Sequence, residues 1–459
     1  MPLITSTDEV RRLLHPNYDS CDSLTLRLEK FVCIESDNKI AEIKRICDCA
    51  ARKGVVRQPT QCFHRIPGAR EFVMQLQSRL LVNHSGGILE NTGLCLHRFF
   101  GAPMVPGSSL KGIARRVALD KVRQAKTVSE KSSALRQTAL AFGWADNDWQ
   151  KNSDFQIVAG DDLQAVWQDC ASSLLKELHL PLPKKYEETP WKALGSFCGT
   201  VAFLPAVAEC PEGSGILEAD LVNCHHPEYY QSTDARRLAL DIENPVPNFF
   251  PAVRAGLDFV FTLAPTPGAA MRLPDIDSHL NFAQDCLRRG LSEHGAGAKT
   301  NAGYGWFEEN QTATEQLAQQ REEEQKEAEE EAALAKMTPE ERAVKDFVEN
   351  KLQANDREGD LKGKMARIDQ LPEEEQRIIC RAIQLNSNFK KIWKNDCIEA
   401  GRAKGPDDKK FGKAYKRVQK VWQAAKKLGV AEELRKVAEK LGVAEELRKV
   451  AEKLGEEMP

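Results

Sequence analysis

A glycine-rich segment with one lysine holds the residue types best suited to binding an anion. It covers residues 295–305, between an expected helix over 278–291 and an expected strand over 304–307. Glycine lets the backbone adopt positive φ and lets a ligand approach without a Cβ in the way. Several N–H groups can then face one point and bind a phosphate. The candidate contacts are Gly295, Gly297, Lys299, Asn301, Gly303 and Gly305.

The same segment is also compatible with a connection that binds nothing. It differs from the phosphate loop of nucleotide-binding proteins. That loop follows a strand, and its lysine comes directly after a glycine. Here Lys299 precedes the second glycine pair, and the segment follows a helix. Three interpretations remain. The segment binds a phosphate of a nucleotide, it binds a phosphate of a nucleic-acid backbone, or it only shapes the fold.

A second candidate site lies at the start of an expected helix near residue 109. Pro106 and Gly107 form a turn there, and either of the two serines that follow suits the N-cap position. Apolar residues between 110 and 118 recur at helical spacing and predict a core face. A helix N-terminus with hydroxyl groups and basic side chains suits a phosphate, and the alternative is a solvated basic face. The residues concerned are Ser108, Ser109, Lys111, Arg115 and Arg116.

Together the two segments resemble the RAMP superfamily of CRISPR proteins, and more closely the sixth-subunit family of the Cmr, or type III-B, effector complex. The matching motifs are Pro-Gly-Ser-Ser-Leu-Lys-Gly at 106–112 and the glycine-lysine segment at 295–305. Shorter matches lie at 89–97, 141–143, 223–230 and 244–250, so the resemblance covers residues 70–308. One stretch departs from the family pattern: residues 203–206 are Phe-Leu-Pro-Ala, where the family often has Phe-x-Asp-Ala.

The resemblance implies an RNA-binding subunit without a cofactor. It would bind the guide RNA near its 3′ end through backbone phosphates and help to position target RNA for antiviral defence, together with other subunits of the complex. Residues 225–251 are too long for an ordinary turn, which favours a functional segment. The resemblance adds His226, Tyr229 and Tyr230, from its His-Pro-x-Tyr-Tyr motif, to the RNA-contacting residues.

An RNA-cleaving subunit, either target-cutting or guide-processing, is the rival function, and a scaffold is a third. Relatives that cleave RNA use an acidic residue on a loop, whereas the sixth-subunit family is generally non-cleaving, so we expect no catalytic residue. His225 and His226 beside Glu228 lack a third partner in the sequence. His84 and Ser85 lack the pattern around a nucleophilic serine, which favours positioning near RNA. The candidate acids are Asp146, Asp148, Asp161 and Asp162.

Bulk composition indicates a chain that is not globally basic. It has 459 residues and a net charge of −3, so a nucleic-acid surface must be local. The sequence has no run of about 18 apolar residues and no signal-peptide pattern, which predicts a cytoplasmic protein without membrane contact. Thirteen cysteines without a Cys-x-x-Cys pair predict small core residues. Cys47, Cys49, Cys62 and His64 match no usual zinc spacing, so we expect no metal.

The order of expected strands and helices is β-α-β-β-α-β with insertions. This predicts an α+β fold with a ferredoxin-like or RRM-like core, followed by an α-helical C-terminal extension. The expected segments are a helical N-terminal extension over 1–65, the RNA-binding domain over 66–308, an acidic helical linker over 309–337, a small helical domain over 338–428, and a tandem 13-residue repeat with a tail over 429–459.

Aromatic and basic residues alternate in the helical extension. Phe411, Tyr415, Val418 and Trp422 recur at helical spacing, which favours a core stripe with lysines outside it over aromatic stacking on RNA. The lysines then remain as a weak RNA or partner surface. The two identical repeats begin at Gly429 and Gly442, and two units are fewer than stacked arrays usually need.

Overall fold

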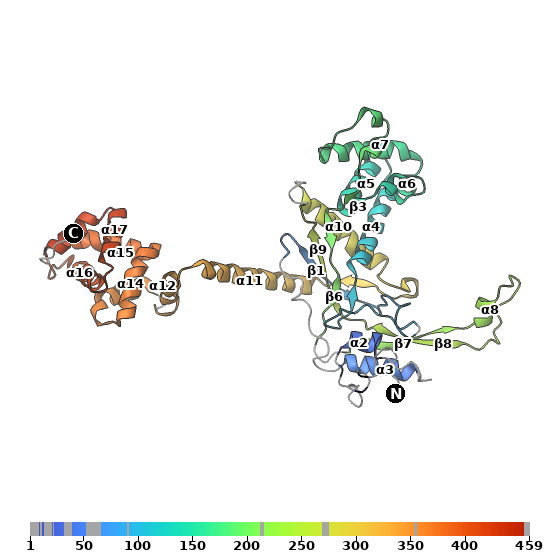
Figure 1. The fold of residues 1–459 in the computed structure, drawn as a ribbon, viewed down its shortest axis with the longest axis horizontal. Coiled ribbons are helices and arrows are strands. Elements are labelled where there is room, and N and C mark those ends of the chain that lie inside the picture. Colours follow the sequence, from blue (N-terminus) through green and yellow to red (C-terminus); the bar gives the residue numbers. More distant parts are fainter. Residues whose placement is uncertain are drawn as a thin grey trace. The chain divides into compact units, whose positions relative to one another are not determined.

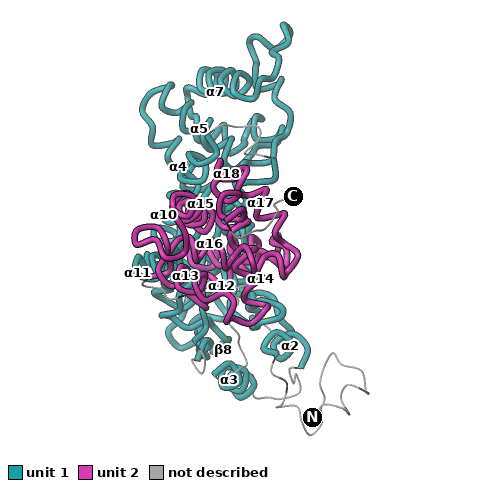
Figure 2. Tube along the Cα trace, turned by 90° about the vertical axis from the view of Figure 1, so that its left-hand side faces the viewer, with its two compact units in different colours: residues 1–320 teal, residues 321–459 magenta. Residues whose placement is uncertain are grey.

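The computed structural model describes residues 23–31, 39–51, 66–89, 91–211, 215–268, 275–352 and 356–453, together with Glu9, Arg12 and Cys21. The chain divides into two compact units, Met1–Gln320 and Arg321–Pro459, which Figure 2 shows in different colours. Unit 1 combines helices with antiparallel strands, and the described part of unit 2 consists of helices and their connections. The expected α+β class is confirmed.

An antiparallel sheet forms the centre of unit 1. Its strand order is β10-β1-β9-β6-β2, and β5 also pairs with β9. Phe72 lies opposite Phe261 in the central pair, and both rings are buried and stacked at 5.3 Å. Alternation of apolar side chains along these strands directs one face into the core. The strands are β1 (Arg70–Leu76), β2 (Met104–Val105), β5 (Val201–Phe203), β6 (Ala206–Ala208), β9 (Asp258–Pro265) and β10 (Phe307–Glu309).

Two long helices share the core of this sheet. They are α4 (Gly107–Gln124) and α10 (Ile276–Glu293), which pack on each other. Leu110 of α4 and Leu287 of α10 are buried in the same cluster as the sheet residues. Gly290 makes their close approach possible, because a Cβ there would lie 2.5 Å from Cγ2 of Ile113. The glycine-rich segment therefore follows a helix, α10, that packs tightly against α4.

A helical insertion with its own core separates α4 from β5 (Figure 1). Its indole rings pack edge to face, with Trp167 in contact with both Trp149 and Trp191. Thr127 and Glu130 form a capping box that begins the first helix. The elements are α5 (Val128–Phe142), β3 (Gly143–Trp144), η3 (Asp146–Trp149), α6 (Asp154–Ala159), η4 (Gly160–Asp162), α7 (Leu163–Glu177), η5 (Lys184–Tyr186), η6 (Pro190–Ala193) and β4 (Phe197–Cys198).

A long hairpin leaves the base of unit 1 and carries a short helix beyond its paired strands (Figure 1). We call residues 217–253 the arm. Its strands are β7 (Leu217–Cys224) and β8 (Val246–Val253), and the helix is α8 (Pro227–Gln231). Two N-terminal helices, α2 (Leu24–Glu29) and α3 (Lys39–Ala50), pack on each other, and α3 contacts both arm strands. The N-terminal extension thus supports the root of the arm.

Helix α11 (Gln311–Lys336) begins in unit 1 and ends in unit 2. Its first turns are tied to the sheet, because Thr314 Oγ1 accepts a bond of 3.0 Å from the Val73 amide and Leu317 is buried. Asn310 caps this start and also bonds Asp258. The acidic linker is expected from residue 309, whereas the first turns of this helix are part of unit 1.

Unit 2 is a bundle of helices around a single core. Thr338 and Glu341 form a capping box, with Pro339 as the first helical residue. The buried residues of both 13-residue repeats join this core. The repeats, expected as a separate segment, therefore pack with the rest of the unit. The helices are α12 (Pro339–Asn350), α13 (Arg357–Ala366), η8 (Ile368–Gln370), α14 (Glu373–Leu385), α15 (Ser387–Arg402), α16 (Gly412–Lys427), α17 (Ala431–Lys440) and α18 (Ala444–Lys453).

The aromatic stripe of the extension lies in that core. Trp393, Tyr415 and Trp422 are each no more than 2% exposed, and Phe389 is 4% exposed. Of the expected core stripe, Tyr415, Val418 and Trp422 are buried, and Phe411 is half-buried against the same core. The buried rings are therefore not available for base stacking.

Candidate nucleic-acid interface

The glycine segment follows α10 as a loop with several left-handed backbone positions. Gly295, Gly297, Gly303 and Gly305 all have φ between +72° and +92°. Lys299 also lies in the left-handed region, at φ 59° and ψ 30°, and begins the short helix η7 (Thr300–Ala302). The sequence-based expectation of positive φ at these glycines is therefore met by the structure.

Three of these glycines are needed by the fold itself. A Cβ on Gly297 would lie 2.1 Å from the Leu81 carbonyl oxygen, and one on Gly305 would lie 1.9 Å from that of Ala296. A Cβ on Gly295 would meet a milder contact, 3.0 Å from the Gly305 carbonyl oxygen. Only Gly303 has open space around its missing side chain. The loop-shaping interpretation accounts for most of the glycines without a ligand.

Hydrogen bonds anchor the loop to the segment that follows β1. The amides of Ala298 and Gly305 donate to the carbonyls of Leu81 and Arg79, both at 2.7 Å, and Ala296 donates to Gly305 at 2.8 Å. These amides are not available for an anion. Within this loop, the N–H groups of Gly297, Lys299, Thr300 and Asn301 bond no acceptor in the described part of the chain. Several of the amides that could have faced an anion are thus already bonded within the chain.

The Lys299 ammonium lies at the root of the arm. Its Nζ is 5.8 Å from the ring centroid of Phe250, and it forms no ion pair with any described residue. The ring of His84 packs edge-on against the same phenyl ring, at 4.7 Å. Burial, and then the charges of Lys299 and Lys39, lower the pKa of His84 below its ordinary value. His84 is therefore neutral at neutral pH, and the positive charge here comes from the lysines.

Lys39 and Asn248 are residues of this site that the sequence analysis did not name. Lys39 begins α3, and its ammonium donates a bond of 2.7 Å to Oδ1 of Asn248 on β8. The charge of Lys39 acts on His84, which places the N-terminal helix beside the root of the arm. The sequence signal nearest to these two residues is the Asn-Pro-Val-Pro match at 244–250, which contains Asn248 but does not indicate which of its side chains has a role.

A polar network joins the glycine loop to β7. The Tyr304 hydroxyl donates a bond of 2.5 Å to Asp220, and Arg79 forms ion pairs with Glu218 and Asp220. Burial, followed by the hydrogen bond to Asp220, raises the pKa of Tyr304 to about 12. Tyr304 therefore stays a neutral donor. The loop and the arm are held as one frame around Lys299.

At the start of α4, the N-cap residue is Pro106, and neither serine has that position. The expectation of Ser108 or Ser109 as N-cap is wrong, because the helix begins at Gly107, where a Cβ would lie 2.0 Å from the Phe203 carbonyl oxygen. Both serines lie exposed in the first turn. Lys111 is half-buried and forms no ion pair with the described residues.

Lys111 and Ser108 line an open groove of about 660 Å³. Residues of the insertion also line it, among them Trp144, Phe197 and the exposed Cys198. Phe203, from the stretch that departs from the family pattern, also lines it. Hydroxyl, ammonium and aromatic groups at one groove suit an anionic ligand with an apolar part.

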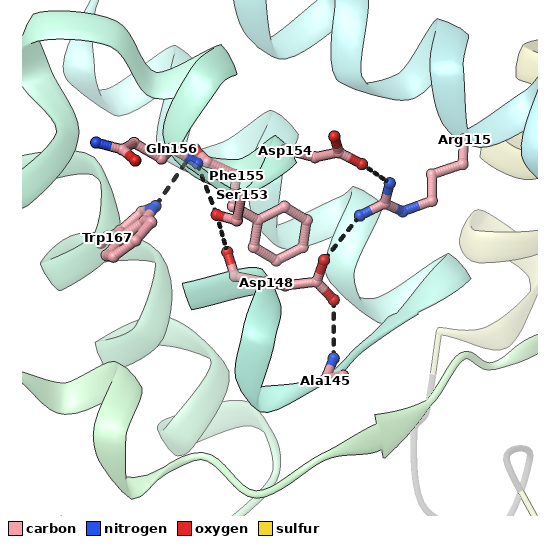
Figure 3. A network of polar contacts seen from close by, with 8 residues as sticks. All are labelled: Arg115, Ala145, Asp148, Ser153, Asp154, Phe155, Gln156 and Trp167. Carbon is pink, nitrogen blue, oxygen red and sulfur yellow. Dashed lines mark hydrogen bonds and ion pairs between the residues drawn. The ribbon is translucent and has the colours of Figure 1, made fainter. Parts of the chain in front are cut away.

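The Arg115 guanidinium forms ion pairs with carboxylates of the insertion (Figure 3). It contacts Asp148 at 3.1 Å and Asp154 at 2.5 Å, and it lies 5.6 Å from the ring centroid of Phe155. Asp148 also accepts a bond of 2.8 Å from the Ala145 amide. This arrangement favours a role of Arg115 in holding the insertion on α4. Arg116 is exposed and forms no ion pair with the described residues.

The three tip residues lie on or beside α8. His226 precedes the helix, and its Nδ1 is 3.2 Å from the Leu240 carbonyl oxygen. Tyr229 and Tyr230 are 43% and 73% exposed, with their ring centroids 5.3 Å apart. The arm also carries exposed aliphatic side chains, and Ile242 is the most exposed of these. The structure therefore groups the candidate contacts in three places: the glycine loop, the α4 groove and the arm tip.

The candidate acids and histidines do not assemble into a metal site. Asp148 pairs with Arg115, Asp162 pairs with Lys131 at 2.9 Å, and Glu228 pairs with Arg237. The described part of the chain contains no cluster of three His, Cys, Asp or Glu residues fit to hold a metal ion. Cys62 and His64 of the zinc arrangement lie outside the described residues. Within the described residues, no helix is both long and apolar enough to cross a membrane.

Comparison with known proteins identifies a relative from Pyrococcus furiosus. No family model matches the sequence. The CRISPR system Cmr subunit Cmr6 of that organism is 27% identical over 238 residues, which cover 50% of this chain and 64% of the relative. The chain thus matches less than two thirds of the relative's length. This match confirms the resemblance to the sixth subunit of the type III-B Cmr complex.

Two solved structures are similar to parts of the chain. The crystal structure of Cmr6 from Pyrococcus furiosus has 21% sequence identity and a TM-score of 0.27, covering 53% of this chain and 98% of that one. A chain in the cryo-EM structure of the type III-B Cmr-beta complex bound to cognate target RNA has 12% identity and a TM-score of 0.30. That match covers 67% of this chain and 78% of the other.

Proposed function

We propose that this Cmr6-like chain is a non-catalytic, RNA-binding subunit of a type III-B effector complex. It holds the guide RNA near its 3′ end and helps to position target RNA. The observation that carries the proposal is Lys299, an ammonium without an ionic partner among the described residues, next to backbone N–H groups without acceptors there. These groups are held in place by the bonds of the loop to Arg79 and Leu81, so little ordering is needed when a phosphate binds.

The strand order supports a ferredoxin-like RAMP core. The first, second, third and fourth strands of the expected β-α-β-β-α-β order correspond to β1, β5 with β6, β9 and β10. The sheet order β10-β1-β9-β6 places the first and third of them at its centre. Helices α4 and α10 occupy the two helix positions, so the glycine loop is the connection from the second helix to the last strand. Both proposed phosphate sites lie at helix ends of this core.

Recognition at this site acts on the backbone of the RNA. Lys299, Lys39 and the free amides are donors that suit phosphate oxygens, and such contacts position a strand without reading its sequence. His84 is neutral and offers a hydrogen bond without adding charge. The exposed Tyr229 and Tyr230 at the arm tip are aromatic surfaces for a base or for a neighbouring subunit. Guide RNA, target RNA and other Cmr subunits are the proposed partners.

Replacing Lys299 by glutamine is expected to weaken binding of single-stranded RNA by the whole chain. The loss of one phosphate contact should make the slope of log affinity against log salt shallower by about 0.7. Fluorescence anisotropy with a labelled oligonucleotide at several salt concentrations measures both effects. Lys151→Gln is the matched control, because Lys151 is exposed and has no ionic partner among the described residues. Equal affinities for K299Q and the unmodified chain would contradict the proposal.

Replacing single candidate acids and His226 is expected to leave target-RNA cleavage by the assembled complex unchanged. The variants are Asp146→Ala, Asp148→Asn, Asp161→Ala, Asp162→Ala and His226→Ala, with asparagine at 148 to keep its backbone contact. A general acid or base contributes about 10²–10⁴-fold to a rate, so its loss is readily detected. Gel analysis of the cleavage products measures this. Loss of one product with assembly intact would make the chain an endoribonuclease.

A further inference from the structure

Unit 2 carries a strongly basic surface on and beside α16. Ten lysines and arginines against two aspartates lie between residues 402 and 427, in a chain whose net charge is −3. Most of these side chains are exposed. We call eight of them the basic face: Arg402, Lys404, Lys409, Lys410, Lys413, Lys416, Lys420 and Lys427.

The members of the basic face are close to one another in two ways. Arg402, Lys404, Lys409 and Lys410 line a single open hollow of about 700 Å³ on the connection between α15 and α16. The remaining four lysines follow on α16 at spacings of three, four and seven residues, which places them along one side of the helix. This row spans about 21 Å at 1.5 Å per residue.

Acidic side chains neutralise little of this charge. Lys416 lies 3.6 Å from Asp407 and Lys420 lies 2.8 Å from Asp369, and both aspartates are largely exposed. Among the described residues, the other six members of the basic face have no ionic partner. Asp408 is turned toward the backbone, where it accepts hydrogen bonds from the amides of Lys404, Lys410 and Phe411.

The frame beneath the basic face is ordered. The three bonds to Asp408 fold the connection back on itself, and Gly412 allows an approach in which a Cβ would lie 2.6 Å from the Pro406 carbonyl oxygen. Arg417 on α16 forms a two-fold hydrogen bond with Asp396 on α15, at 2.8 and 2.6 Å. The cations are therefore presented on fixed elements, which lowers the entropy lost when a ligand binds.

The aromatic residues of α15 and α16 are buried, so this surface offers charge with little base stacking. A row of four lysines about 21 Å long, two of which contact only exposed aspartates, matches a ligand with repeated negative charges better than a single anion. A nucleic-acid strand presents one phosphate per ~3.4 Å, so several phosphates fit along the row. We propose that the basic face binds the phosphate backbone of a single RNA strand, independently of base sequence and separately from Lys299.

The test uses the full-length chain with four lysines of the basic face changed to glutamine: Lys404→Gln, Lys409→Gln, Lys410→Gln and Lys413→Gln. The matched control removes four lysines elsewhere in unit 2: Lys345→Gln, Lys362→Gln, Lys436→Gln and Lys440→Gln. Affinity for a labelled oligouridine is measured by anisotropy over a range of salt concentrations. The basic-face variant should lose about 10–100-fold in affinity, and its salt slope should become shallower by up to about 3, while the control keeps both.

Three outcomes would overturn the proposal. They are equal affinities of the two quadruple variants, competition by polyglutamate as effective as competition by unlabelled RNA, and loss of binding in the charge-conserving variant Lys404→Arg, Lys409→Arg, Lys410→Arg and Lys413→Arg. The Lys299→Gln background separates this proposal from the function proposed above. If K299Q alone leaves binding unchanged while the basic-face variant loses it, the glycine-loop proposal fails and this one stands.

Discussion

Replacing Gly297 by alanine is expected to destabilise unit 1 by about 2–5 kcal/mol. A residue with a Cβ costs about 1–2 kcal/mol in the left-handed region, and crowding in a packed site adds about 1–3 kcal/mol. Both terms apply, because Gly297 has φ +83° and its Cβ would lie 2.1 Å from the Leu81 carbonyl oxygen. That carbonyl accepts the Ala298 amide, so the bond that anchors the loop must also lengthen.

Hydrogen exchange of peptides from β1 and α10 measures this effect, because it reports the free energy of local opening. Gly303→Ala is the matched control in the same loop: its φ is +92°, but nothing lies within 4 Å of its Cβ position. It should cost only the backbone term, about 1–2 kcal/mol. RNA affinity should fall more in G297A than in G303A, since Lys299 is two residues away. Equal costs in the two variants would show that the contact with Leu81 is unimportant.

Replacing Asp396 by alanine is expected to destabilise unit 2 by about 3–5 kcal/mol, because breaking a buried ion pair leaves an uncompensated charge. The Asp396 side chain is 3% exposed and that of Arg417 is 15% exposed. The pair ties α15 to α16, so exchange should accelerate in peptides of both helices. An equally large effect on unit 1 would contradict the division of the chain into two units.

Asp369→Ala provides the comparison for an exposed pair. Asp369 is 53% exposed and contacts Lys420 on the same helix α16, so its loss should cost at most about 1 kcal/mol. The combined change Asp396→Leu with Arg417→Met should recover most of the stability lost in D396A, because two apolar groups of similar volume leave no buried charge. A double variant as unstable as D396A would show that packing, and not charge, holds the two helices together.

Local features of the fold were predictable because neighbouring residues determine them. Thr338 and Glu341 form a capping box through atoms three residues apart, and the core stripe at Phe411, Tyr415, Val418 and Trp422 follows from the helical repeat. The positive φ of the loop glycines is also a local property. The motifs at 106–112 and 295–305 likewise indicated the resemblance that the sequence of a Pyrococcus furiosus relative confirms.

Only the tertiary structure decided what these residues contact. Arg115 resembled a phosphate ligand, but its partners Asp148 and Asp154 come from an insertion more than 30 residues away. Lys39 reaches Asn248 across 209 residues, and Gly297 is required by a carbonyl of Leu81. Residues far apart in the chain approach only when the sheet, α4, α10 and the arm have packed. Spacing along the sequence therefore determined each element, and packing determined which cations have carboxylate partners and which have none among the described residues.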